Sequence, residues 1–127
     1  MPNSLIIGQA SESLLKQVEK DGFDCTVANS LADAHVAMAK DGFDLVIADL
    51  ELPDASGLEL LPTLADRPRS DLVLVTGQGS LESAVEAFRG GAVDYLTLPV
   101  DLTRLRTLLA RTLLAARGRG VPPWVSV

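Results

Sequence analysis

Five short apolar segments recur along the chain, and segments of helical character separate them. The apolar segments are 5–7, 25–28, 45–48, 72–76 and 92–97. Each is short and rich in Leu, Ile, Val or Ala, which favours a buried strand over a buried helix. The segments between them space their apolar residues three or four apart, as one face of a helix does. This alternation predicts a parallel sheet with helices on both faces.

The length of 127 residues suits one domain. Because crossovers between parallel strands are right-handed, few topologies remain. We predict an α/β fold, a flavodoxin-like, doubly wound sheet of five parallel strands in the order 2-1-3-4-5 with five helices. The predicted helices are 11–21, with Ser11 or Ser13 as its cap, 30–40, 57–64, 80–89 and a last helix that Asp101 caps.

Composition excludes several classes of protein. The net charge of −6 argues against direct contact with nucleic acid or an anionic membrane. No apolar stretch approaches the roughly 18 residues of a membrane span, and the N-terminus lacks the features of a signal peptide. The single cysteine, Cys25, cannot form an intrachain disulfide, which fits a reducing compartment. We therefore expect a cytoplasmic protein.

One acidic residue, Asp49, lies at the end of a predicted buried strand. Asp49 directly follows the third apolar segment, and a loop with Pro53 and Gly57 comes next. In open parallel sheets, ligands bind in the crevice beyond the carboxyl ends of the strands. Thr76 ends the fourth predicted strand and Tyr95 lies in the fifth. These residues predict a functional site around Asp49.

The order of these motifs resembles the receiver domain of two-component response regulators. The matching segments are 49–57, 75–80, 84–87 and 91–97, followed by Pro99. Their later half is most similar to the receivers of sigma-54-dependent transcriptional activators of the nitrogen-regulator type. The resemblance implies a signalling module, not an enzyme, that serves in a phosphorelay and controls transcription through an output domain. Residues 1–117 would form the receiver domain, and 118–127, rich in Gly and Pro, a linker or tail.

The resemblance also implies roles for single residues. Asp49 would be the phosphoacceptor, taking a phosphoryl group from a histidine kinase or a small phosphodonor. Thr76 would bond that group and move inward, and the ring of Tyr95 would move with it as part of a conformational switch. The family uses an acid pair after the first strand to hold Mg²⁺ and a lysine before Pro99 to pair with the phosphate. The peptide bond before Pro99 is often cis in the family.

The acid pair and the lysine of the family are both missing from this sequence. Gly8 and Gln9 stand where the acid pair is expected, and Leu98 stands where the lysine is expected. Because each charge-assisted contact contributes ~1.5–3 kcal/mol, we expect phosphorylation to be weak or lost. Mg²⁺ binding should be weak as well, with Asp49 and Glu51 as its possible ligands.

An alternative hypothesis is that the chain is a pseudo-receiver, which acts independently of phosphorylation as a protein–protein interaction or dimerisation module. In either case, the fourth and fifth predicted helices would bind an output domain, a partner protein or a second copy. Simpler roles also remain open for the site residues. Asp49 could be a capping or turn residue, Thr76 an ordinary end of a strand, and Tyr95 a packing residue.

Overall fold

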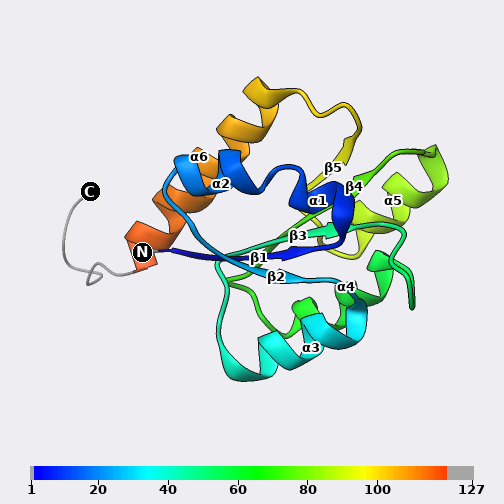
Figure 1. Cartoon of the computed structure of the whole chain (residues 1–127), viewed down its shortest axis with the longest axis horizontal. Helices are drawn as coiled ribbons and strands as arrows, with labels where there is room; N and C mark the ends of the chain where they lie inside the picture. Colours follow the sequence, from blue (N-terminus) through cyan, green and yellow to red (C-terminus); the bar gives the residue numbers. More distant parts are fainter. Residues whose placement is uncertain (1, 120–127) are drawn as a thin grey trace.

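A computed structural model describes residues 2–119 and shows a sheet of five parallel strands (Figure 1). The strand order is β2-β1-β3-β4-β5, which confirms the predicted topology. The strands are β1 (Asn3–Ile7), β2 (Asp24–Ala28), β3 (Leu45–Asp49), β4 (Asp71–Thr76) and β5 (Asp94–Thr97). β3 therefore lies at the centre of the sheet, and its last residue is Asp49.

The central strands β1, β3 and β4 are mostly apolar because helices cover both faces of the sheet there, whereas the edge strand β2 is largely exposed. Side chains of successive strand residues point to opposite faces. Val46 and Ala48 of β3 accordingly belong to one buried core, and Leu45 and Ile47 to the other. All five residues of β3 are buried, which fixes its register firmly.

Helices form a layer on each side of this sheet. Helices α1, α2 and α6 cover one face, and α3, α4 and α5 cover the other (Figure 1). None of the helices in the described part of the chain is long and apolar enough to span a membrane. The helices are α1 (Gln9–Glu12), α2 (Leu15–Lys20), α3 (Leu31–Lys40), α4 (Leu60–Ala65), α5 (Leu81–Arg89) and α6 (Leu102–Arg119), and a 3-10 turn, η1 (Gly57–Glu59), precedes α4.

The prediction of five helices was wrong, because the first one divides into α1 and α2. The N–H of Leu14 donates to the carbonyl of Ser11, a three-residue step that interrupts the α-helical repeat. Neither Ser11 nor Ser13 is the N-cap of a helix, since Gly8 precedes α1 and Leu14 precedes α2. Ser11 lies inside α1, and the hydroxyl of Ser13 donates to the carbonyl of Ala10.

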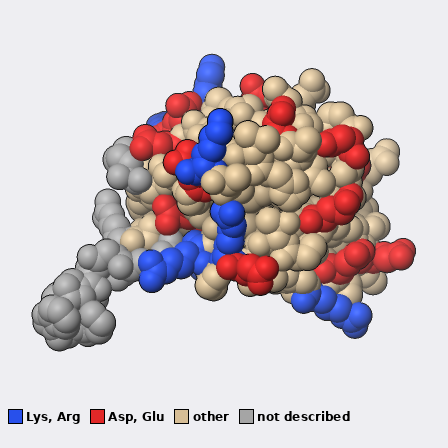
Figure 2. Space-filling model, turned by 90° about the horizontal axis from the view of Figure 1, so that it is seen from below, with Lys and Arg blue, Asp and Glu red and all other residues tan. Residues whose placement is uncertain are grey.

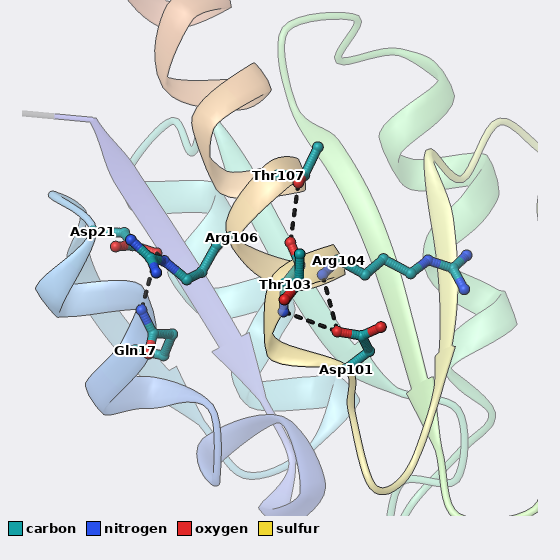
Figure 3. Close-up of polar contacts among 7 residues, drawn as sticks. All are labelled: Gln17, Asp21, Asp101, Thr103, Arg104, Arg106 and Thr107. Carbon is teal, nitrogen blue, oxygen red and sulfur yellow. Dashed lines mark hydrogen bonds and ion pairs between the residues drawn. The ribbon is translucent and has the colours of Figure 1, made fainter.

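The predicted cap of α6 is present. One carboxylate oxygen of Asp101 accepts from the N–H groups of Thr103 at 2.9 Å and Arg104 at 3.3 Å (Figure 3). This satisfies two of the N–H groups that the first turn of a helix leaves without partners. The cap fixes the start of α6 directly after the loop that leaves β5.

Polar contacts also join α6 to the end of α2. Arg106 of α6 places its Nε 3.9 Å from Asp21, and the Gln17 amide donates to the same carboxylate at 3.1 Å (Figure 3). α6 continues to Arg119, beyond the boundary predicted after residue 117. The rest of the predicted tail, 120–127, lies outside the described residues.

Candidate functional site

Asp49 lies at the carboxyl edge of the sheet, at the floor of a pocket. The pocket has a volume of about 410 Å³. The side chain of Asp49 is almost fully buried, with only 7% of the residue exposed. The pocket is lined by Gly8, Gln9, Asn29, Asp49, Glu51, Leu52 and Pro53. The structure thus brings Gly8 and Gln9 into the same pocket as Asp49.

Both carboxylate oxygens of Asp49 already accept hydrogen bonds from α1. Oδ2 accepts from the N–H of Ala10 at 3.0 Å. Oδ1 accepts from the N–H and from the hydroxyl of Ser11, each at 2.7 Å. The negative carboxylate therefore occupies the N-terminal end of α1, where unpaired N–H groups create a partial positive charge. Asp49 therefore bonds the first turn of α1 from outside the helix, whose N-cap residue is Gly8.

Gly8 makes this close approach possible. Its φ of +96° lies in the region that residues with side chains rarely adopt. A Cβ at this position would lie only 2.4 Å from the Asp49 carboxylate. A Cβ on Gly57 would likewise lie 2.2 Å from the backbone oxygen of Asp49. The two glycines let backbone pack directly against the acid on both sides.

Thr76, which the resemblance gave as the residue that bonds the phosphoryl group, bonds the carboxylate of Glu51. Its hydroxyl is buried at the end of β4 and donates to the Glu51 carboxylate at 2.7 Å. The same hydroxyl oxygen accepts from the N–H of Gln78 at 3.1 Å. The Glu51 carboxylate therefore bonds Thr76 of β4, while the Asp49 carboxylate bonds α1.

The remaining predicted residues lie on β5 and just after it. Tyr95 is buried, and its hydroxyl lies 2.6 Å from the Ser83 hydroxyl of α5. The peptide bond between Leu98 and Pro99 is cis. Leu98 is 38% exposed and does not line the pocket that holds Asp49. The side chain in the expected lysine position is therefore an exposed apolar group.

The arrangement around Asp49 contains few charges that could hold a metal ion. Asp49 and Glu51 are the two carboxylates that line the pocket, and each accepts the bonds just given. Within residues 2–119, no group of three or more His, Cys, Asp or Glu is placed to bind a metal ion.

Two residues that complete the site were missed by sequence reasoning. Ser11 was considered only as a helix cap, although it supplies two of the three donors to Asp49. Asp54, in the loop after β3, accepts from the N–H groups of Leu31 at 2.9 Å and Ala32 at 3.0 Å. These backbone bonds lower the pKa of Asp54 below its ordinary value of 3.8. Asp54 thereby ties the loop that follows Asp49 to the start of α3.

The comparisons with known proteins agree with this fold and site. The family model described as "Response regulator receiver domain" matches residues 8–110. The chain is 42% identical over 91 residues to "Response regulator protein PilR" of Pseudomonas aeruginosa, a match that covers 71% of this chain and 20% of PilR. It is 32% identical over 111 residues to "Photosynthetic apparatus regulatory protein RegA" of Rhodobacter capsulatus, covering 87% of this chain and 58% of RegA.

A solved structure is similar over nearly the whole chain. The signal receiver domain of a putative Luxo repressor protein from Vibrio parahaemolyticus superposes with a TM-score of 0.80 at 30% identity. The match covers 94% of this chain and 95% of that structure. The chain belongs to the response regulator receiver domain family. It is the receiver domain of a two-component response regulator, as its motifs predicted, and receiver domains are signalling modules.

The contact between Ser11 and Asp49 should be measurable as stability. We expect Ser11→Ala to lower the free energy of unfolding by ~1.5–3 kcal/mol, because it removes a buried donor to a charged acceptor. In an Asp49→Asn background, the same change should cost less, because the acceptor is then neutral. Urea denaturation of the four proteins of this double-mutant cycle measures the coupling. An equal loss in both backgrounds would contradict the contact.

The acid dependence of stability should report Asp54. Its lowered pKa stabilises the fold fully above the ordinary value of 3.8, and this contribution disappears as the pH falls through the pKa of the folded state. Asp54→Asn should therefore be less stable than the natural protein at neutral pH, and the difference should shrink below about pH 4. Urea midpoints from pH 7 to pH 3 test this. Asp66→Asn, at the exposed end of α4, controls for the change in net charge.

Proposed function

We propose that this receiver domain passes on a signal without stable phosphorylation of Asp49. The observation that carries the proposal is the set of three donors from α1 that bind both oxygens of Asp49. A carboxylate is a weak nucleophile and needs an available oxygen and neutralised charge to accept a phosphoryl group. In this pocket, three donors already use most of the roughly four acceptor positions of the carboxylate, so an attack by Asp49 competes with its bonds to Ala10 and Ser11.

The residues around Asp49 also fit Mg²⁺ poorly. Receiver domains in general bind Mg²⁺ at the phosphorylation site. Mg²⁺ demands near-octahedral coordination by oxygen, usually from carboxylates and water. Asp49 is turned toward α1, Glu51 is turned toward Thr76, and Gln9 supplies only a neutral amide. These contacts support weak Mg²⁺ binding and, with Leu98 in place of lysine, weak retention of a phosphate.

The signal would be delivered to an output domain that controls transcription. The chain spans only a fifth of PilR and 58% of RegA, and both are named as regulatory proteins. The similarity to PilR, AlgB and ZraR supports the predicted kinship with receivers of sigma-54-dependent activators. We also propose that the protein is cytoplasmic and that it does not act as an enzyme. A histidine kinase would be a partner only if Asp49 becomes available.

The face formed by α5 and the start of α6 is the proposed partner surface. Leu81, Val85 and Phe88 lie on one side of α5 and are 82%, 38% and 49% exposed. Leu98 and Leu102 extend the exposed apolar residues to the loop before α6 and its first turn. Exposed apolar groups gathered in this way are typical of protein interfaces. We propose that a second copy of the chain covers them.

Charge supports a protein partner over a nucleic acid. The net charge is −6. On the face shown in Figure 2, Lys and Arg are interspersed among Asp and Glu and form no continuous basic surface. A nucleic acid would need such a surface, because phosphate contacts dominate its affinity.

Phosphorylation tests the central proposal. The protein incubated with Mg²⁺ and acetyl phosphate should keep its mass in intact-mass spectrometry, because Asp49 is held by α1. Asp49→Asn serves as the control for modification elsewhere. A gain of one phosphoryl group in the natural protein that Asp49→Asn abolishes would refute the proposal.

Self-association tests the surface. Sedimentation velocity should show concentration-dependent association of the natural protein, and Phe88→Ser should weaken it about tenfold or more, as a central interface residue does. Val36→Ser is the matched control, since Val36 is 55% exposed on α3, on a different part of the molecule. Equal association of the two variants would contradict the surface.

A further inference from the structure

We propose that the Glu51 carboxylate is a built-in anion that holds the β4–α5 loop and, through it, Tyr95 and α5 in their observed positions. The inference rests on the proposed function, because it gives the domain a state that requires no phosphoryl group. It makes Glu51 a positioning residue. It also predicts a conformational response when that one carboxylate is removed.

The first step is the contact between Glu51 and Thr76. The Thr76 residue is 1% exposed, so its hydroxyl needs a partner within the protein. Glu51 provides it with both carboxylate oxygens, at 2.7 and 3.1 Å. Asp49 does not compete for this hydroxyl, because its own oxygens are bound by Ala10 and Ser11. The anion beside Thr76 is therefore Glu51.

The second step leads from Thr76 into the β4–α5 loop. While the Thr76 hydroxyl donates to Glu51, its oxygen accepts from the N–H of Gln78 at 3.1 Å. A single rotamer of Thr76 thus serves both contacts, and a charged acceptor on one side strengthens the pair. Loss of the carboxylate would free the hydroxyl to rotate and release the first residues of the loop.

The third step leads from the loop to Tyr95. Gly79 of this loop packs closely against β5. A Cβ at this position would lie 2.6 Å from the Thr97 side chain and 3.5 Å from the Tyr95 ring. The next residue, Ser80, donates its N–H to the Tyr95 hydroxyl at 3.4 Å. The loop that Thr76 anchors therefore forms the cover over the tyrosine ring.

The last step reaches α5. The Tyr95 hydroxyl lies 2.6 Å from the hydroxyl of Ser83, which is in the first turn of α5. Ser80 caps the same helix by accepting from the N–H of Ser83 at 3.1 Å. Contiguous bonds thus run from Glu51 to the helix that carries the exposed apolar residues. Glu51 itself is exposed, so its removal opens no cavity in the core, but it leaves the buried Thr76 hydroxyl without its acceptor.

Tyr95 gives this inference a direct probe, because it is the one tyrosine of the chain. The full chain labelled with 3-fluorotyrosine should give a single fluorine resonance, well separated from that of the urea-unfolded protein. In Glu51→Ala, the resonance should shift toward the unfolded position. Amide hydrogens in the first turn of α5 should exchange about tenfold faster or more, since a bond to a charged acceptor is lost.

Two further variants make the experiment decisive. Glu51→Gln keeps the shape and one acceptor oxygen but loses the charge, and it should shift the resonance in the same direction as Glu51→Ala. Glu19→Ala removes an exposed carboxylate from α2 and should leave the spectrum unchanged. The inference is overturned if Glu51→Ala keeps the natural spectrum, if Glu51→Gln does so, or if Glu19→Ala produces the same shift.

This experiment separates the inference from the proposed function. The Glu51 variants are measured without any phosphodonor, so they report only the internal contact. Phosphorylation of Asp49 would instead appear as a change in the natural protein when Mg²⁺ and beryllofluoride are added. A response to beryllofluoride refutes the proposed function, and a silent Glu51→Ala refutes the role of Glu51.

Discussion

The bonds between the Asp49 carboxylate and the first N–H groups of α1 determine the rest of the site. A buried carboxylate is costly unless several donors satisfy it, and Ala10 and Ser11 supply three. This contact sets the start of α1 and the course of the loop that follows β1. It also leaves Glu51 to bond Thr76.

The residues Gly8 and Gln9 explain why α1 can approach Asp49 so closely. Carboxylates at positions 8 and 9 would add two negative charges beside Asp49, and their repulsion would need a cation to offset it. Gly8 and Gln9 add no charge, and Gly8 also removes the side chain that would collide with the Asp49 carboxylate. The substitutions are therefore consistent with a pocket whose negative charge is offset by backbone N–H groups. They do not require a resident metal ion.

The sequence predicted the parts of the fold that depend on local patterns. The five apolar segments and the cap at Asp101 follow from residue type and spacing within a few positions, and the strand order follows from the right-handedness of crossovers between parallel strands. The division of the first helix did not follow from them, because its start is fixed by an acid 38 residues away. The bond between Thr76 and Glu51 also could not be predicted, because the two residues are 25 positions apart in the sequence. Such contacts depend on how loops from separate strands meet.

The two carboxylates at this edge of the sheet have separate structural roles. Asp49 holds the start of α1, and Glu51 bonds the last residue of β4, although only one residue lies between the two acids. Their side chains diverge because Asp49 ends the buried strand while Glu51 belongs to the exposed loop that follows. Breaking the Asp49 contact leaves a buried carboxylate without its donors, which is costly. Breaking the Glu51 contact returns an exposed carboxylate to water and leaves only the buried Thr76 hydroxyl without its acceptor. If this domain has a movable element, the physical chemistry therefore places it on the side of Glu51 and α5.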